Sequence, residues 1–259
     1  MDKYKINPKA KEINIKSRTK KEFLLFHGYT GSPSDFNMLP RKLNEKFNAS
    51  VRVILLKGHG THVSELNNYL FFDDYIEQAE KELMKSLNAG RNVILGGYSF
   101  GGQIALYLAS KYGDKIEGVF SISTPYPLSF FLSTKPMTLI SKMKKEWKKP
   151  LSKTEVDKRN EAFYYEYMPG HTLEIIRQGV KKLKKTLHNI KAPLFLVNSK
   201  NDIWIPNRSV KLLMKHINSE FVDYTLIEHK GHSLFYSVKQ NEVYSKIIKF
   251  LKKIKTFNS

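Results

Sequence analysis

Short apolar runs alternate along the chain with segments in which apolar residues recur every three or four positions. The runs are rich in β-branched and aromatic residues and cover residues 22–26, 51–56, 92–95, 116–123, 193–197 and 221–227. The helical patterns lie near 34–47, 72–88, 100–112, 207–217 and 236–255. Unbroken apolar strands between helices of about 10–15 residues indicate a parallel sheet with both faces covered. We therefore expect an α/β protein of three layers with a mostly parallel central sheet.

The alternation stops between residues 123 and 192, where no convincing strand pattern is present. Residues 152–155 read Ser-Lys-Thr-Glu, a capping box that predicts a helix running toward Met168. A single apolar stripe at helical spacing then extends over residues 173–187. We expect residues 125–190 to form a small helical cap over the carboxyl edge of the sheet, where open α/β sheets bind ligands. Residues 1–124 and 191–259 would form the core.

Composition narrows the class of protein. With 41% hydrophobic residues among 259, the chain can bury the core of one large domain with an insertion. The absence of cysteine excludes disulfides, thiolate catalysis and cysteine-ligated metals. The first residues lack the apolar segment of a signal peptide, and no apolar run approaches the roughly 18–20 residues that span a bilayer. We expect a cytoplasmic protein.

The net charge of +20 suggests three possible causes: a nucleic-acid partner, an anionic membrane surface, or a solvated lysine coat. The excess is lysine rather than arginine, and no helix-turn-helix, zinc-finger or ribonucleoprotein signature is present. A solvated coat is the simplest interpretation, and a nucleic-acid partner is not expected.

Four glycines surround one serine in the sequence GGYSFGG, residues 96–102. Glycine inside a helix costs about 0.5–1 kcal/mol relative to alanine, so the cluster needs another reason. Gly97-Tyr98-Ser99-Phe100-Gly101 fits the G-x-S-x-G nucleophile elbow, in which a sharp strand-to-helix turn exposes the serine hydroxyl. The helix amino terminus there would also favour developing negative charge. A phosphate-binding loop or an ordinary turn is the alternative, although no Gly-Lys-Ser/Thr follows.

A second turn, HGYTG at residues 27–31, follows the first strong strand, where an elbow enzyme needs another backbone donor. Acyl transfer places negative charge on the substrate carbonyl oxygen, and preorganised N–H groups stabilise that charge. We expect the backbone N–H groups of Tyr29 and Phe100 to be the two donors.

A serine nucleophile also needs a general base. His232 follows Gly231 in a loop after the last strand, which would present it at the sheet edge. His229, at the strand end, is the weaker alternative.

The base in turn needs an acid that fixes its tautomer. Asp202 follows the strand at 193–197, and the order Ser99, Asp202, His232 is that of α/β-hydrolases. Asp223, inside a strand, and Glu228, close in sequence to His232, are weaker candidates.

The motifs HGYTGSP, LKGHGTH, GGYSFGGQIAL and SKNDIWIP, with a closing GHS, resemble those of the bacterial carboxylesterase and monoacylglycerol lipase family. The resemblance spans roughly residues 22–250 and implies the α/β-hydrolase fold, with a small helical cap inserted after the sixth strand. It also implies a triad without a cofactor, carried here by Ser99, Asp202 and His232. The implied reaction is hydrolysis of short- to medium-chain acyl esters or monoacylglycerols through an acyl-enzyme.

Substrate contacts are expected from His27, Tyr126, Ile203 and Trp147. No metal site is expected, because no nearby carboxylate completes the histidines of the sequence KGHGTH at 57–62. The expected partner is a small ester or lipid, and the sequence does not predict an oligomeric state.

The lysine-rich segment 137–149 leaves two interpretations open. If it is helical, Met137, Leu139, Ile140, Met143 and Trp147 share one face rimmed by lysines, the pattern of helices that lie in a membrane interface. The cap would then contact anionic membranes weakly. Alternatively, this face packs over the active site as a lid. Both interpretations predict a preference for uncharged acyl esters.

Other activities remain open at this point. A thioesterase, an amidase or an acyltransferase would use the same triad. A protein of another class, a basic surface-binding protein with a vestigial triad, would keep these residues without turnover.

Overall fold

Seven strands form the central sheet of the computed structural model, which describes residues 4–126, 139, 143, 145–149 and 161–258. Their order across the sheet is β1-β3-β2-β4-β5-β8-β9. Only β1 is antiparallel to its neighbour, so the sheet is mostly parallel, as the sequence predicts. The strands are β1 Ile13–Ile15, β2 Lys21–Phe26, β3 Ser50–Ile54, β4 Asn92–Tyr98, β5 Ile116–Ile122, β8 Leu194–Asn201 and β9 Val222–Lys230.

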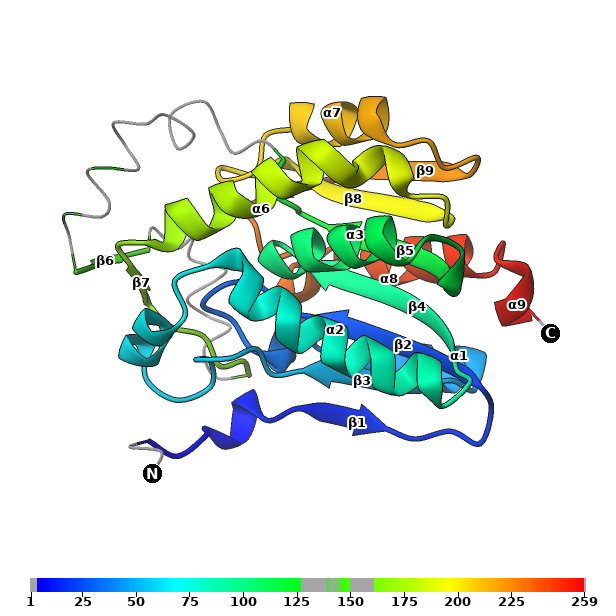
Figure 1. Ribbon diagram of the computed structural model, residues 1–259, viewed down its shortest axis with the longest axis horizontal. Helices are drawn as coiled ribbons and strands as arrows, with labels where there is room; N and C mark the ends of the chain where they lie inside the picture. The colour runs from blue at the N-terminus through cyan, green and yellow to red at the C-terminus, as the bar shows by residue number, and fades with distance from the viewer. Residues whose placement is uncertain (1–3, 127–138, 140–142, 144, 150–160, 259) are drawn as a thin grey trace.

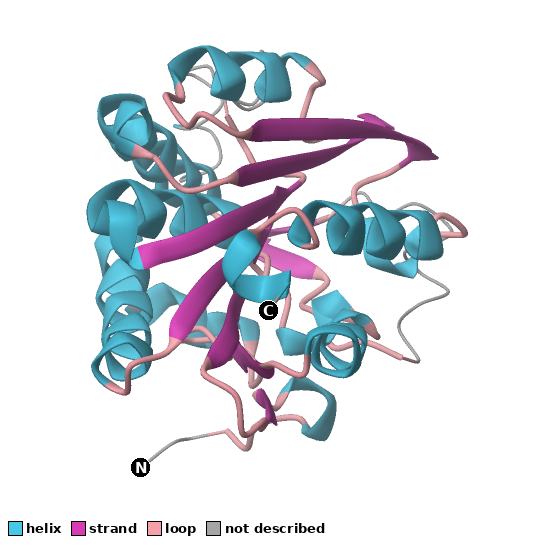
Figure 2. Cartoon of the chain, turned by 90° about the vertical axis from the view of Figure 1, so that its right-hand side faces the viewer, coloured by secondary structure: helices cyan, strands magenta, loops and turns pink. Residues whose placement is uncertain are grey.

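Helices cover both faces of this sheet (Figures 1 and 2). The α-helices are α1 Leu39–Phe47, α2 Phe72–Asn88, α3 Phe100–Tyr112, α6 Thr172–Thr186, α7 Arg208–His216, α8 Gln240–Leu251 and α9 Lys255–Asn258. Short 3-10 turns are η1 Pro8–Ala10, η2 Pro33–Phe36, η3 Val63–Asn68, η4 Gly113–Lys115, η6 Leu187–Asn189 and η7 Leu234–Tyr236. Across the described residues, every helix is too short or too polar to cross a membrane.

The core is divided by the sheet into two clusters. Strand β2 shows why, because its side chains alternate between the faces. Leu24 and Phe26 pack with apolar residues of α2, α3, α6 and α7, whereas Phe23 and Leu25 pack with residues of α1 and α8. Burial on both faces explains why the parallel strands are continuous apolar runs rather than alternating ones. The carboxyl ends of these strands are thereby held in fixed positions at one edge.

The insertion after β5 differs from the expectation. It follows the fifth described strand rather than the sixth, because β1 is the only described strand before β2. It also contains strands: β6, Glu146–Lys148, pairs antiparallel with β7, Tyr167–Pro169. The expected helix toward Met168 is therefore wrong at its end, and a helix through residues 146–148 is wrong as well. The capping box at 152–155 lies outside the described residues, as do Met137 and Ile140.

Helix α6 agrees with the predicted stripe. Its buried residues Leu173, Val180 and Leu183 lie on one face, and Ile175 joins them. Ile175, Val180 and Leu183 pack into the same cluster as α2 and α3 (Figure 1), whereas Leu173 packs with Ile205. The helix consequently behaves as part of the layer that covers the sheet.

Candidate active site

Ser99 stands at the sharp turn between β4 and α3. Its φ of +53° is a strained conformation for a residue with a side chain. A hydrogen bond from its N–H to the Ile122 carbonyl, 2.7 Å, holds this turn. A Cβ at Gly97 would overlap the carbonyl of Gly101, and a Cβ at Gly101 would overlap the carbonyl oxygen of Phe26. Both glycines are thus required by close backbone approach, as a nucleophile elbow demands.

Asp202 and His232 form a pair at the carboxyl edge of the sheet. The His232 Nδ1 lies 2.7 Å from Asp202 Oδ2, and the aspartate side chain is fully buried. The other oxygen, Oδ1, accepts hydrogen bonds from the backbone N–H groups of Trp204, 2.8 Å, and Ile205, 3.1 Å. The carboxylate is therefore fixed in orientation. Because it accepts a hydrogen bond from His232, the proton of the neutral imidazole must lie on Nδ1. Nε2 is then the basic nitrogen.

The alternative base and acids lie elsewhere. His229 is a residue of β9 and does not line the cavity described below. Asp223, near the amino end of β9, pairs with Lys253 at 3.2 Å. Glu228 is exposed and pairs with Lys200. The structure brings none of these three to Ser99.

Ser99 and His232 both line one cavity of about 150 Å³. Part of its wall is apolar and is contributed by Pro125, Met168, Leu173, Ile176, Trp204 and Ile205. Another part is polar and carries Thr30, Asp35, Lys149, Tyr164 and Tyr236. Residues from the core strands, from the insertion and from α6 therefore enclose the serine together.

The loop 28–31, here called the oxyanion loop, forms part of this cavity. Among the described residues, neither the Tyr29 N–H nor the Phe100 N–H donates a hydrogen bond to a backbone carbonyl of another segment. Phe100 is the first residue of α3, so its N–H has no partner within the helix. Of the two expected donors, Tyr29 lines the cavity, and Phe100 follows the cavity residue Ser99 directly.

The four residues expected to contact substrate do not line the cavity. His27 is completely buried, and Tyr126 packs beside His216 with 1% of its surface exposed. Ile203 is 63% exposed, and its neighbours Trp204 and Ile205 line the cavity instead. Trp147 packs against the Leu173–Ile205 cluster from outside. The sequence placed these residues near the site but could not give the direction of their side chains.

Two charged residues in the cavity were not predicted. Asp35 accepts a hydrogen bond from the Gly28 N–H, 3.0 Å, and its carboxylate occupies the space that a Cβ on Gly31 would need. Burial raises the pKa of Asp35 to about 7, against the lowering effects of the Gly28 N–H, Lys149 and His232. Lys149 donates to Thr30 Oγ1 at 3.0 Å. The only sequence signal for Asp35 is its position four residues after the HGYTG turn.

A family profile described as "Serine aminopeptidase, S33" (Hydrolase_4) matches residues 17–238. The chain belongs to this family. The match covers Ser99, Asp202 and His232, together with the insertion, so the S33 assignment includes every element that forms the cavity.

Similar proteins agree with the S33 assignment and with the resemblance found in the sequence. A carboxylesterase of Bacillus subtilis (strain 168) is 24% identical over 236 residues, 90% of this chain and 93% of the relative. A thermostable monoacylglycerol lipase of Bacillus sp. (strain H-257) is 23% identical over 233 residues, 89% and 90% of the two chains. A solved structure from work on the metagenome-derived lipolytic enzymes LipS and LipT is 16% identical. It superimposes with a TM-score of 0.82, covering 96% of this chain and all of the other, and shows the α/β-hydrolase fold.

Proposed function

We propose that this protein hydrolyses carboxylic esters through an acyl-enzyme on Ser99. The observation that carries the proposal is the shared cavity of Ser99 and His232, with Asp202 holding the imidazole from behind. Ser99 Oγ attacks the ester carbonyl carbon while His232 Nε2 takes its proton. The N–H groups of Tyr29 and Phe100 stabilise the oxyanion of the tetrahedral intermediate.

The intermediate collapses with cleavage of the bond to the leaving alcohol, which receives the proton from His232. A water molecule then attacks the acyl-enzyme, giving up its proton to His232. The second tetrahedral intermediate releases the carboxylic acid, and Ser99 recovers its proton. The protein needs no cofactor for these steps, because the triad and the two donors supply every proton transfer and charge contact.

The proposed substrates are short- to medium-chain acyl esters or monoacylglycerols. The apolar part of the cavity wall, which includes Leu173, Ile176 and Ile205, suits an uncharged acyl chain. Relatives named as a carboxylesterase and a monoacylglycerol lipase support the same class. We expect p-nitrophenyl butyrate to be cleaved faster than an ester whose acyl chain ends in a carboxylate.

The first prediction tests the triad. Ser99→Ala and His232→Ala should each lower kcat about 10⁴-fold or more, since the residues act as a unit. Asp202→Asn should also lower it strongly because the amide cannot hold the same tautomer. Hydrolysis of p-nitrophenyl esters and labelling by a fluorophosphonate, located by mass spectrometry, measure both effects.

Two matched variants control for general damage to the fold. His216 is the last residue of α7, and Ser219 follows that helix. The variants Ser219→Ala and His216→Ala should both keep wild-type turnover. Labelling at a serine other than Ser99 would contradict the mechanism. Faster cleavage of a p-nitroanilide or a thioester than of the matched ester would reassign the substrate to amides or thioesters. A folded protein without any turnover would favour a surface-binding protein with a vestigial triad.

The insertion offers a second, separable proposal, weak contact with anionic membranes. Leu139 and Met143 are 64% and 80% exposed, and the lysines at 145 and 148 beside them are exposed too. Each lysine near an anionic surface contributes about 1 kcal/mol, which salt weakens. Trp147, part of the expected apolar face, is half-buried and packs against the cluster of Leu173 and Ile205.

The second prediction concerns this contact. The protein should sediment with phosphatidylserine vesicles at low salt and be released at high salt. Replacing both Leu139 and Met143 by Asp should weaken binding, whereas Val238→Asp, at a 92% exposed apolar position outside the insertion, should not. Sedimentation that is equal in all variants, or absent in the wild type, would leave the insertion as a cover of the cavity.

A further inference from the structure

Two buried histidines, His27 and His59, connect the oxyanion loop to the loop 57–61. His59 has no role in the triad mechanism. His27 precedes the oxyanion loop and His59 lies in the 57–61 loop, with their rings 4.9 Å apart. Both side chains are almost completely buried. Neither reaches the cavity, so neither can act on the substrate directly.

The hydrogen bonds of the two rings are reciprocal. His27 Nε2 accepts the backbone N–H of Leu56 at 3.0 Å, and its Nδ1 lies 2.9 Å from the Gly28 carbonyl. His59 Nε2 accepts the N–H of Thr30 at 3.2 Å, and its Nδ1 lies 2.9 Å from the Lys57 carbonyl. Each imidazole therefore accepts a hydrogen bond from a backbone N–H of the opposite segment and donates one to a backbone carbonyl of its own segment.

These contacts fix the protonation state of both rings. Because each Nε2 accepts an N–H, the single ring proton must lie on Nδ1. Burial lowers the pKa of His59 to about 4, and the hydrogen bonds to Lys57 and Leu56 only partly offset this effect. Burial likewise keeps the pKa of His27 well below its usual value. The acceptor nitrogens are therefore unprotonated near neutral pH.

Thr30, the residue after the expected donor Tyr29, is held at three points. Its φ of +64° is strained for a β-branched residue and persists only if neighbouring contacts enforce it. Its N–H is bound by His59, its carbonyl accepts the Tyr165 N–H at 2.8 Å, and its hydroxyl accepts Lys149 Nζ at 3.0 Å. Contacts from two segments distant in sequence thus maintain one strained residue.

We propose that His59 is a positioning residue, which captures the Thr30 N–H and thereby aims the neighbouring Tyr29 N–H at the oxyanion of the reaction. The inference depends on the proposed hydrolysis for its effect on rate, but the contact itself does not. The Thr30 N–H belongs to the Tyr29–Thr30 peptide, which adjoins the Gly28–Tyr29 peptide that carries the Tyr29 N–H. Without the contact to His59, rotation of the first peptide would let the second turn its N–H away from the developing charge. Removing a donor outright typically costs about 10²–10³ in kcat, so misdirecting one should cost less.

A pair of substitutions separates the two hydrogen bonds of His59. Glutamine places an oxygen near the position of Nε2 and can still accept the Thr30 N–H. Asparagine places its amide near Nδ1, so it keeps the donor to Lys57 and loses the acceptor. We expect His59→Asn to lower kcat about 10- to 100-fold with KM little changed, because the oxyanion contact is made only in the transition state. His59→Gln should recover most of that loss.

His62→Asn is the matched control, since His62 is exposed and caps the short turn η3 instead. The affinity of a trifluoromethyl ketone, whose adduct with Ser99 carries an oxyanion, should fall by the same factor as kcat/KM. Fluorophosphonate labelling counts the active sites, so that kcat is given per folded molecule. A general loss of folded protein would then not lower the ketone affinity and kcat/KM by the same factor. Equal loss of kcat in His59→Asn and His59→Gln would overturn the positioning role.

Amide hydrogen exchange tests the contact without any assay of activity. The Thr30 amide should be protected in the wild type and in His59→Gln, and should exchange at least about tenfold faster in His59→Asn. A wild-type protein that hydrolyses no ester would refute the proposed function, while this measurement would still decide the contact. Rapid exchange of Thr30 in the wild type would overturn the inference even if esterase activity were present.

Discussion

Asp35 is a carboxyl group whose pKa the fold raises strongly. Its carboxyl group shares the cavity with Ser99 but is surrounded closely enough that its pKa rises from 3.8 to about 7. Between these two pH values the folded protein holds a proton that the unfolded chain releases. Asp35 therefore contributes stability at low pH that is lost as the pH rises toward and through 7.

The third prediction follows from this sign. Asp35→Asn keeps an oxygen that can accept the Gly28 N–H and removes the charge. The variant should match the wild type near pH 4 and be more stable by on the order of 1–3 kcal/mol at pH 9. Urea unfolding at several pH values measures the difference. Asp223→Asn, a half-buried aspartate paired with Lys253, is the control and should show no such trend. A less stable Asp35→Asn at pH 9 would mean that the charged carboxylate is favourable.

The sequence predicts the functional residues that follow strands in a known order, but it does not predict residues whose roles depend on packing. Ser99, Asp202 and His232 each follow a strand, so strand boundaries alone place them at one edge. From the sequence, His59 is only one of two histidines that no carboxylate completes into a metal site, and no pattern gives Asp35 a role. The role of His59 comes from a contact with Thr30 across 29 residues of chain, and that of Asp35 comes from burial, neither of which leaves a local pattern.

The nucleophile elbow is the element on which the site depends most directly. Helix α3 approaches β2 so closely that a side chain at Gly101 would overlap the backbone of Phe26. If α3 moved away from β2 to make room, the amino end of the helix would shift, together with Ser99 and the Phe100 N–H.

The fourth prediction is that Gly101→Ala destabilises the protein by about 3 kcal/mol or more, or prevents folding, and reduces kcat in any folded fraction. Gly90→Ala is the control, because no atom lies within 4 Å of the added methyl group, although its φ of +67° carries a cost of about 1 kcal/mol. Thermal unfolding and active-site counting compare the two. Equal stability losses would show that space at the elbow is not limiting.

The sequence predicts the long helices well, but it does not predict the very short strands. The helices α2, α3 and α6 agree with the expected ranges because each presents an apolar face over three or more turns. The three-residue strands β1, β6 and β7 are too short to show an alternation, so the sequence assigned the last two to helices. The division at residue 190 remains a prediction, and the packing of α6 in the core layer favours ending the insertion before Thr172.

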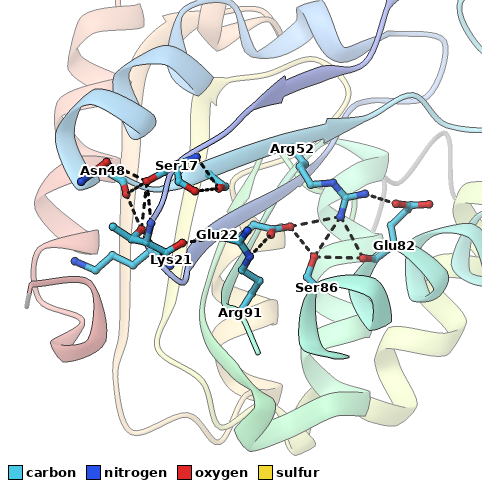
Figure 3. A network of polar contacts seen from close by, with 10 residues as sticks. Ser17, Lys21, Glu22, Asn48, Arg52, Glu82, Ser86 and Arg91 are labelled. Atoms are coloured by element: carbon cyan, nitrogen blue, oxygen red, sulfur yellow. Dashed lines mark hydrogen bonds and ion pairs between the residues drawn. The ribbon is translucent and has the colours of Figure 1, made fainter. Parts of the chain in front are cut away.

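Across the whole molecule, polar chemistry is divided between the two edges of the sheet. The carboxyl edge carries the cavity, and the amino edge carries a buried network around Glu22 (Figure 3). Glu22, 4% exposed, accepts the Ser86 hydroxyl at 2.6 Å and pairs with Arg52 at 3.4 Å and Arg91 at 3.8 Å. Arg52 also pairs with Glu82, which ties α2 to the sheet.

The fifth prediction uses this separation of the two edges. Glu22→Ala should lower the free energy of unfolding by about 1–3 kcal/mol, because it removes the buried acceptor of the Ser86 hydroxyl and one of the two carboxylates paired with Arg52. Glu228→Ala removes an exposed ion pair and should cost less than about 1 kcal/mol. Both variants should retain wild-type kcat per folded molecule. A large change in kcat for Glu22→Ala at constant active-site count would show that the two edges are coupled.

The contact between residues 163–165 and the core has a consequence for recombining members of the family. Ser32 Oγ donates to the Phe163 carbonyl at 2.8 Å, the Phe163 N–H donates to Ser34 Oγ at 3.0 Å, and Tyr165 bonds to Thr30. A hybrid gene that takes the insertion from a relative, including the residues equivalent to 163–165, would also replace the partners of the oxyanion loop. Substrate preference and turnover are therefore inherited together unless the crossover is placed after Tyr165.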